Sequence, residues 1–252
     1  MSVRKPLDGK TALVTGSGKR IGRSCALALA NMGARVIVHY NHSKSEALET
    51  AAALDRITES TAIKADLTDK EQIDDLFDTS VKKFGSIDIL VNSASVFPSD
   101  SVLNFTVEDY TNNFAINAFA PLLLSRLLAG QKTAADRRDI INFLDTRITD
   151  FDKKHAAYHL SKRDLFAITR MLALELAPEV RVNAIAPGLI LPPPGESEEY
   201  LENLKATNPL GKTGSLDDIT RALVFLLTNE FITGQVLFID GGRHLKGSFY
   251  GT

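Results

Sequence analysis

The feature that most constrains this fold is a regular alternation of short apolar runs with longer stretches of helical periodicity. Runs rich in β-branched residues and leucine predict strands at Thr11–Thr15, Arg35–Tyr40, Thr61–Ala65, Ile87–Val91, Asp139–Leu144, Val180–Ala186 and Gln235–Ile239. Apolar residues spaced as on one helix face predict helices over Ile21–Met32, Ser45–Ile57, Lys70–Phe84, Val107–Leu128, Ala156–Leu176 and Leu216–Thr228. Because parallel strands need crossover connections, this alternation predicts an α/β fold with one doubly wound, parallel seven-stranded sheet and helices on both faces.

The whole chain, residues 1–252, is predicted to form a single domain. No Gly/Ser linker, charge block or internal repeat divides it. Only the proline-rich stretch at residues 192–195 interrupts the alternation of predicted strands and helices. In doubly wound sheets, ligands bind beyond the carboxyl ends of the strands, near the point where the strand order reverses. The loops that follow the strands are therefore where functional residues are expected.

Composition excludes several other classes of protein. With 29 Lys+Arg against 31 Asp+Glu, the formal net charge is −2, which does not suit a nucleic-acid surface. Apolar residues make up 44 % of the chain, which argues against disorder, and the one cysteine, Cys25, cannot form an internal disulfide. The uncharged runs Thr111–Ser125 and Val182–Gly195 are shorter than the ~20 residues of a membrane-spanning helix. We therefore expect a soluble, cytoplasmic protein with no metal, nucleic-acid or membrane partner.

A glycine-rich turn follows the first predicted strand. It reads Thr-Gly-Ser-Gly-Lys-Arg-Ile-Gly over residues 15–22 and leads directly into the first predicted helix. Glycines let the backbone turn tightly and approach a pyrophosphate, which the free N–H groups of a helix N-terminus stabilise. The turn thus predicts a dinucleotide site, and the alternative is a tight strand-to-helix turn without a ligand.

The loop after the second predicted strand indicates which dinucleotide binds. Folds that prefer NAD usually carry an Asp or Glu there, which accepts a hydrogen bond from the ribose 2′-hydroxyl. Here residues 41–43 are Asn-His-Ser, and no acidic residue occurs before Glu46. Together with Lys19 and Arg20 from the first turn, this loop suits a 2′-phosphate and favours NADP(H) over NAD(H). The alternative is a solvated loop that carries ordinary surface charges.

Tyr158 and Lys162 lie four residues apart within a predicted helix, so both side chains share one face. A nearby ammonium favours the phenolate and lowers the pKa of a tyrosine from ~10, which makes the phenol a usable proton donor near neutral pH. The pair alone is a weak motif, and its weight comes from the motifs around it.

Taken together, these motifs resemble the short-chain dehydrogenase/reductase family over nearly the whole chain. The family pattern continues here as Asn-Ser-Ala-Ser at 92–95, Asn117, Pro-Gly at 187–188 and Asp-Gly-Gly at 240–242. The resemblance implies a Rossmann-type fold, an NADP(H) cofactor and a homo-oligomer, specifically a tetramer. The cofactor-binding positions that it implies, together with those given by the two loops, are Gly16, Lys19, Arg20, Ile21, Gly22, Asn41, His42, Ser43, Asp66, Leu67, Asn92, Ala94, Ser95, Tyr158, Lys162, Pro187, Gly188 and Leu189.

Three departures from the family pattern point to one branch. Arg20 replaces a glycine of the first motif, Ser95 replaces a later one, and Asp145 lies 13 residues before Tyr158, where a serine usually orients a carbonyl substrate. These changes resemble the pteridine reductases, and the C-terminal third resembles bacterial dihydromonapterin reductases. The branch implies an NADPH-dependent enzyme that transfers hydride to a C=N bond of a dihydropterin, with dihydrofolate as a further substrate.

The resemblance assigns catalytic roles to four residues. Tyr158 would donate a proton, Lys162 would bind the nicotinamide ribose and depress the pKa of Tyr158, and Asn117 would hold a water molecule in a proton path. Asp145 would accept hydrogen bonds from the amino and ring N–H groups of the pterin. The alternatives are a mid-helix Asn117 satisfied by backbone groups, an Asp145 that caps the following segment, and an Asp66 that caps a helix instead of contacting adenine.

Substrate contacts are expected from Arg20, Ser95, Phe97, Asp145 and Tyr158. Phe97 would serve as an aromatic platform for the flat ring, although a phenylalanine is commonly a core residue. A flap over the substrate is expected at about residues 189–206, with a polyproline-type turn as the alternative, and His155 would either touch substrate or lie on the surface.

Two other functions remain open. One is a general carbonyl reductase of the same family, such as a 3-oxoacyl thioester reductase, against which Arg20 and Asp145 argue. The other is a regulator that senses NADP(H) without turnover, against which the intact Tyr158, Lys162 and Asn117 argue.

Overall fold

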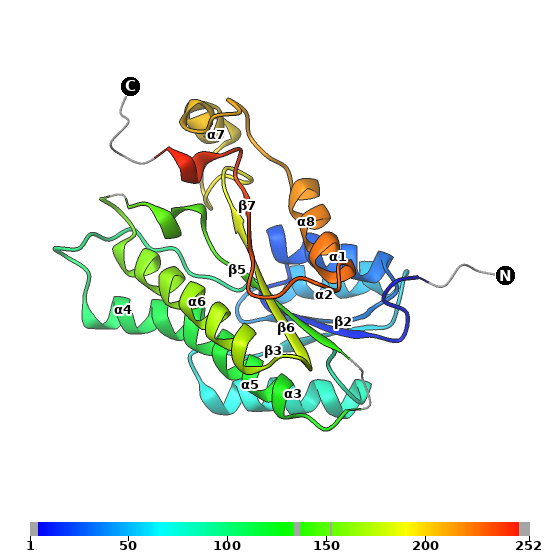
Figure 1. The fold of residues 1–252 in the computed structure, drawn as a ribbon. Helices are drawn as coiled ribbons and strands as arrows, with labels where there is room; N and C mark the ends of the chain where they lie inside the picture. Colours follow the sequence, from blue (N-terminus) through cyan, green and yellow to red (C-terminus); the bar gives the residue numbers. More distant parts are fainter. Residues whose placement is uncertain (1–4, 134–136, 152, 247–252) are drawn as a thin grey trace.

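One seven-stranded parallel sheet forms the centre of the molecule (Figure 1). The computed structural model describes residues 5–133, 137–151 and 153–246. Within these residues the strands pair in the order β3-β2-β1-β4-β5-β6-β7. Their bounds are β1 Thr11–Val14, β2 Arg35–Tyr40, β3 Ser60–Lys64, β4 Ile89–Asn92, β5 Arg138–Phe143, β6 Val180–Pro187 and β7 Val236–Ile239. The predicted fold class is confirmed, and each strand starts and ends within two residues of its predicted position.

Helices cover both faces of the sheet, because successive residues of a strand point to opposite sides and here both sides are apolar. One apolar core joins the sheet to α1 (Arg20–Asn31), α2 (Lys44–Leu54) and α8 (Leu216–Thr228). A second core joins it to α3 (Lys70–Phe84), α5 (Ala120–Gly130) and α6 (Ala156–Glu175). Figure 1 shows the two groups on opposite sides.

The predicted helix over Val107–Leu128 is interrupted. It consists of α4 (Val107–Phe114), a π-helical turn at Ala115–Phe119, and then α5. The π-turn widens the helix at Asn117 and turns that side chain inward, a local distortion that π-turns commonly provide at functional sites. By length and composition alone the run from Val107 to Gly130 could cross a membrane, but half of its apolar window is buried within the fold.

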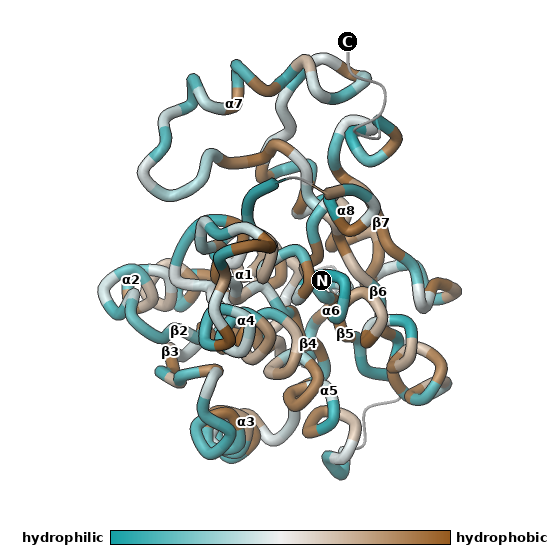
Figure 2. The backbone as a smooth tube through the Cα atoms, turned by 90° about the vertical axis from the view of Figure 1, so that its left-hand side faces the viewer, coloured by the Kyte–Doolittle hydropathy of each residue, from teal (hydrophilic) through white to brown (hydrophobic). Residues whose placement is uncertain are grey.

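The expected flap contains a helix that its proline-rich sequence did not predict. Residues 191–197, which contain a bend and a turn but no helix or strand, lead into α7 (Glu198–Leu204) and a 3-10 turn at Lys205–Thr207. Two glutamates in the first turn of α7 suit the positive end of the helix dipole, and Leu201 is buried beneath the helix. Figure 2 shows α7 at one end of the molecule, above the sheet and the helices that flank it.

The strand order reverses between β1 and the central strand β4. The loops after β1 and β4 therefore diverge at their carboxyl ends and leave a crevice, as doubly wound sheets do. A side chain ties the bases of the two loops together: the Thr15 hydroxyl accepts hydrogen bonds from the N–H groups of Ser93 and Ala94, each at 3.0 Å. This crevice positions the site described next.

Candidate active site

A cavity of about 820 Å³ opens at the carboxyl edge of the sheet. Its walls come from the loops after β1, β2, β4, β5 and β6, from the start of α6, and from α7. Of the predicted site residues, the cavity is lined by Gly16, Lys19, Arg20, Ile21, Gly22, Asn41, His42, Ser43, Leu67, Ala94, Ser95, Phe97, Asp145, His155, Tyr158, Lys162, Pro187, Gly188 and Leu189. The topology thus brings together residues that lie far apart in the sequence.

Backbone contacts build the nucleotide end of the cavity. A Cβ atom added to Gly22 would lie 2.4 Å from the carbonyl oxygen of Gly16, and one added to Gly16 would lie 2.8 Å from Cα of Ala94. Neither position has room for a side chain, and Gly16 also has a φ of 64°, in the left-handed region. The tight turn at the start of α1 therefore depends on glycine at both positions.

His39 anchors this turn from below, a role that the sequence gave no signal for. Its Nδ1 accepts a hydrogen bond from the Gly16 N–H at 3.1 Å, and its Nε2 lies 3.1 Å from the Ala65 carbonyl oxygen, so the neutral ring donates there. His39 is 2 % exposed, and this burial lowers its pKa from 6.5 to about 4. The imidazole is neutral at physiological pH, as both hydrogen bonds require.

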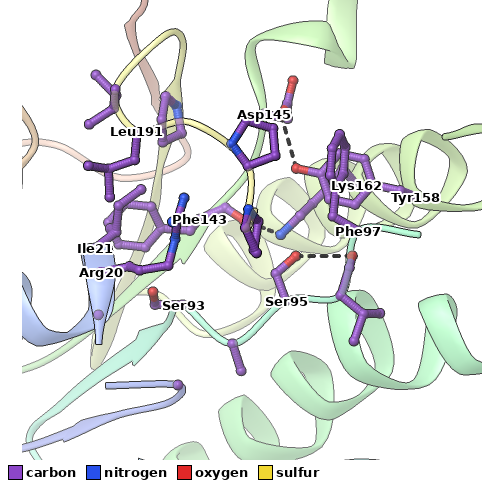
Figure 3. Close-up of a pocket in the computed structure, with 18 of the residues that line it drawn as sticks. Arg20, Ile21, Ser93, Ser95, Phe97, Phe143, Asp145, Tyr158, Lys162 and Leu191 are labelled. Carbon is purple, nitrogen blue, oxygen red and sulfur yellow. Dashed lines mark hydrogen bonds between the residues drawn. The ribbon is translucent and has the colours of Figure 1, made fainter. Parts of the chain in front are cut away.

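The cationic residues of the first turn lie at the surface of the cavity. Lys19 is exposed and its ammonium is 3.8 Å from the Glu46 carboxylate. Arg20 has a φ of 55°, unusual for a residue with a side chain, and its guanidinium donates a 2.6 Å hydrogen bond to the Pro192 carbonyl. Arg20 therefore connects the glycine turn to the flap. Figure 3 shows Arg20 and the flap residue Leu191 on the same side of the cavity.

The catalytic end is organised around a hydrogen bond between Tyr158 and Asp145 (Figure 3). The Tyr158 hydroxyl donates to Oδ2 of Asp145 at 2.9 Å. The other carboxylate oxygen accepts from the Arg147 N–H at 2.7 Å and so caps a 3-10 turn at Thr146–Thr149. Asp145 thus acts both as the cap that one interpretation of the sequence predicted and as a neighbour of the tyrosine.

Lys162 follows on the same face of α6. Its ammonium donates to the Phe143 carbonyl at 2.8 Å and lies 5.7 Å from the centre of the Tyr158 ring. Burial lowers the pKa of Lys162 to about 8, an effect that the negative charge of Asp145 partly offsets. The lysine therefore holds its proton less firmly than a surface lysine.

The expectation that Lys162 lowers the pKa of Tyr158 is wrong for this structure. Burial raises the pKa of the phenol well above 10, and the charge of Asp145 and its hydrogen bond raise it further. An anionic neighbour disfavours a second negative charge, and Asp145 is hydrogen-bonded directly to the phenol, whereas the Lys162 ammonium donates to the Phe143 carbonyl. Tyr158 is consequently a neutral hydrogen-bond donor.

Asn117 does not line the cavity. Its amide oxygen accepts from the Val96 N–H at 3.0 Å, and its amide nitrogen donates to the Val96 carbonyl at 3.1 Å and to the Ser161 hydroxyl at 3.0 Å. These contacts fit the alternative in which backbone groups satisfy the side chain. Asn117 therefore fixes the loop after β4 against α6.

Phe97 lies beside Tyr158 and is 43 % exposed. Its ring stacks on His155 with centroids 3.8 Å apart, and it meets the Tyr158 ring edge-on at 4.6 Å. His155 is held in turn by the Pro98 carbonyl, 2.6 Å from Nδ1. His155 thus supports Phe97 within the cavity wall and is not an isolated surface histidine.

Two further predicted cofactor residues lie outside the cavity lining. Asp66 accepts hydrogen bonds from the Thr68 N–H and hydroxyl at 2.9 and 2.8 Å, which lower its pKa. Asp69, not Asp66, caps α3. Asn92 is buried and its amide donates to Asn142 at 2.8 Å, so it ties β4 to β5.

Several lining residues were not named individually from the sequence, although two of them lie within the predicted flap at about residues 189–206. Tyr200 and Leu201 enter from α7, Arg147 from the loop after β5, and Arg243 from the C-terminal 3-10 turn. Arg243 directly follows the Asp-Gly-Gly motif in the sequence, but the sequence does not indicate that its side chain points into the cavity. Within the described ranges, no group of three or more His, Cys, Asp or Glu side chains is arranged to hold a metal ion.

Comparison with known proteins assigns the family. The family model described as enoyl-(acyl carrier protein) reductase matches residues 16–244, nearly the whole chain. An uncharacterised oxidoreductase from Methylorubrum extorquens is 34 % identical, over 94 % of this chain and 98 % of its own length. The chain belongs to the short-chain dehydrogenase/reductase family.

Relatives within this family differ in what their names say they reduce. A tetrahydroxynaphthalene reductase from Pyricularia oryzae is 32 % identical, over 94 % of this chain and 90 % of the relative. The crystal structure of FolM alternative dihydrofolate reductase 1 from Brucella canis, complexed with NADP, is 31 % identical and has a TM-score of 0.91. The alignment covers all of this chain and 98 % of that one.

Proposed function

We propose that this short-chain dehydrogenase/reductase is an NADPH-dependent reductase of dihydropterins, acting on a C=N bond of the ring. The observation that carries the proposal is the 2.9 Å hydrogen bond from Tyr158 to Asp145. Asp145 occupies the position where the family pattern usually has a serine for carbonyl substrates. A carboxylate accepts hydrogen bonds from the amino and N–H groups that a pterin presents, which a ketone lacks. The crystallised neighbour named as an alternative dihydrofolate reductase supports the same assignment.

NADP(H) is the cofactor that the nucleotide end fits. The two crowded glycines bring backbone close to the place of the pyrophosphate, and α1 directs its N-terminus there. His42, Ser43 and Lys19 line the same end, where a 2′-phosphate needs cationic and hydroxyl partners. The neighbouring crystal structure contains NADP, which supports this cofactor prediction.

The bound cofactor supplies the hydride, and the side chains of this chain supply the proton and the orientation. Tyr158 is neutral and buried, so it can donate its proton to the ring nitrogen while hydride reaches the adjacent carbon. Asp145 holds the phenol and is positioned to accept from the substrate, and Lys162 places positive charge beneath the tyrosine. Phe97 offers an aromatic contact to a flat ring, and Leu191, Pro193 and Pro194 of the flap form part of the cavity wall together with α7.

A general carbonyl reductase is the second candidate, favoured by relatives such as the tetrahydroxynaphthalene reductase. A non-catalytic NADP(H) sensor is the third, and the assembled Tyr158, Asp145 and Lys162 cluster argues against it. The cytoplasmic location, expected from the composition, and the homotetramer, implied by the resemblance, also belong to this proposal. Light scattering on the purified protein measures the tetramer.

The experiment follows NADPH absorbance with the purified protein and a dihydropterin, dihydrofolate or a panel of ketones. Asp145→Ser is compared with Asp78→Ser, which removes an exposed carboxylate on α3 outside the cavity. We expect Asp145→Ser to lower kcat/KM for dihydropterin about 100-fold, since charge-assisted hydrogen bonds contribute about 1.5–3 kcal/mol. Turnover of ketones alone would reject the pterin function, and tight NADPH binding without any turnover would favour the sensor.

A further inference from the structure

A small basic cavity adjoins the catalytic cavity. It has a volume of about 180 Å³ and is lined by residues of the loop after β5, the end of the flap and the C-terminal 3-10 turn. Thr146, Arg147 and Arg243 line both cavities, so the two spaces share a wall beside Asp145. Nothing in the catalytic proposal uses this second space.

Positive charge dominates its lining. Arg147, Arg243 and Lys246 contribute cationic side chains, and Asp150 contributes one carboxylate. The Lys246 ammonium donates to the Ala206 carbonyl at 3.1 Å, which places it at the end of the flap. Clustered cations of this kind suit a ligand group of negative charge.

Arg243 is a cation that lines both cavities. Its side chain is partly buried, yet its guanidinium forms no hydrogen bond or ion pair with any residue in the described ranges. Burial lowers its pKa, the nearby charge of Arg147 lowers it further, and Asp145 acts in the opposite direction. A desolvated guanidinium beside a like charge is unfavourable until an anion joins it.

The backbone that carries Arg243 is held firmly. Buried Asp240 accepts from the N–H groups of Gly242 and His244, at 2.9 and 2.8 Å, and from the Thr146 hydroxyl. The His244 ring pairs with the same carboxylate at 2.9 Å and stacks on Phe238. The guanidinium is therefore presented from a fixed support, as a binding group needs to be.

We propose that Arg243, with Arg147 and Lys246, binds an anionic tail, carboxylate or phosphate, of a substrate whose ring lies in the catalytic cavity. This inference rests on the proposed function for the identity of the ring. A guanidinium binds carboxylate and phosphate with paired hydrogen bonds, so the small cavity selects pterins with a charged tail over pterins with a neutral one.

The test compares three substrates and three variants. Dihydrofolate carries carboxylates, dihydroneopterin monophosphate carries a phosphate, and dihydrobiopterin has a neutral tail. The variants are Arg243→Gln, Arg243→Lys and the control Arg56→Gln, which removes an exposed charge outside both cavities. Thermal unfolding of each variant checks that it is folded.

We expect Arg243→Gln to lower the ratio of kcat/KM for a charged-tail substrate to that for dihydrobiopterin about tenfold, and Arg243→Lys to restore part of it. The control leaves the ratio unchanged. The charged substrate that shows the larger loss identifies carboxylate or phosphate as the group bound. An equal change for all three substrates would overturn the inference while leaving pterin reduction intact.

A binding measurement separates this inference from the proposed function. Calorimetry with p-aminobenzoylglutamate, which has the carboxylates but no pterin, is run on the protein loaded with NADP. We expect binding that Arg243→Gln weakens about tenfold. If no pterin is reduced but this binding holds, the anion site stands and the ring assignment fails. Absence of fragment binding together with an unchanged substrate ratio rejects the anion site.

Discussion

The two ends of the cavity are built in different ways. At the nucleotide end, main-chain atoms set the shape: the crowded Gly16 and Gly22 leave no room for side chains, and His39 binds the turn through a backbone N–H. At the substrate end, side chains set the shape: Asp145 and Tyr158 bind each other, and Arg20 reaches across to the flap.

This difference predicts how each end of the cavity responds to mutation. A backbone cradle presents the same N–H groups whatever the neighbouring side chains are, so it suits a cofactor common to a whole family. A site built from side chains changes its chemistry by single substitutions, as Asp145 in place of serine illustrates. Mutations at the substrate end should therefore alter the reaction, and mutations at the nucleotide end should alter cofactor binding.

The largest effect is expected from Tyr158→Phe. This substitution removes the hydroxyl that donates the proton but keeps the ring and its contact with Phe97. The kcat for dihydropterin should therefore fall about 1000-fold, which is within the range for general acids. The affinity for NADPH, measured by fluorescence titration, should change less than about threefold, because one cofactor contact at most is lost. A comparable loss of both quantities would show that the two ends are not separable.

An intermediate effect is expected from Gly22→Ala. The added methyl would lie 2.4 Å from the Gly16 carbonyl oxygen and must displace the turn, so the affinity for NADPH should fall about 30-fold, equivalent to about 2 kcal/mol.

Gly130→Ala is the matched control, because nothing lies within 4 Å of the added methyl at the end of α5. It should leave cofactor affinity unchanged and should not destabilise the protein. Unaltered NADPH binding by Gly22→Ala would show that the shape of the glycine turn does not determine the affinity for the cofactor.

The smallest effect is a pH dependence centred on His39. Its pKa is lower in the folded chain, about 4, than the 6.5 of an exposed histidine, so the unfolded chain binds the extra proton first. The free energy of unfolding should therefore fall by about 2 kcal/mol from this group between pH 7 and pH 5.

Urea denaturation at a series of pH values measures this slope, and His39→Asn, which cannot titrate, should flatten it. The protection factor of the Gly16 amide, which is corrected for the intrinsic pH dependence of exchange, should also fall as the pH approaches 4, because protonation of Nδ1 removes the acceptor of its N–H. Identical slopes in the unaltered protein and in His39→Asn would show that His39 does not contribute to the pH dependence of stability.

Some elements could be predicted well because their signals are local. The alternation of β-branched runs with helical periods gave the parallel sheet, and glycine in the first turn gave the cradle. The π-turn at Asn117 could not be predicted in this way, because it depends on contacts with Val96 and Ser161. The raised pKa of Tyr158 was likewise missed, since it depends on burial and on the distance to a carboxylate 13 residues away.

What the sequence by itself determined is the architecture and the family, because backbone conformation and apolar periodicity are set by neighbours along the chain. Only the tertiary structure decided how Asp145 uses its two oxygens, that Arg20 holds the flap, and that Arg243 faces the substrate end without a partner among the described residues. The physical reason is that charge and hydrogen bonding act through space. Their effect depends on distance and burial, which are fixed only when the strands, helices and flap have packed.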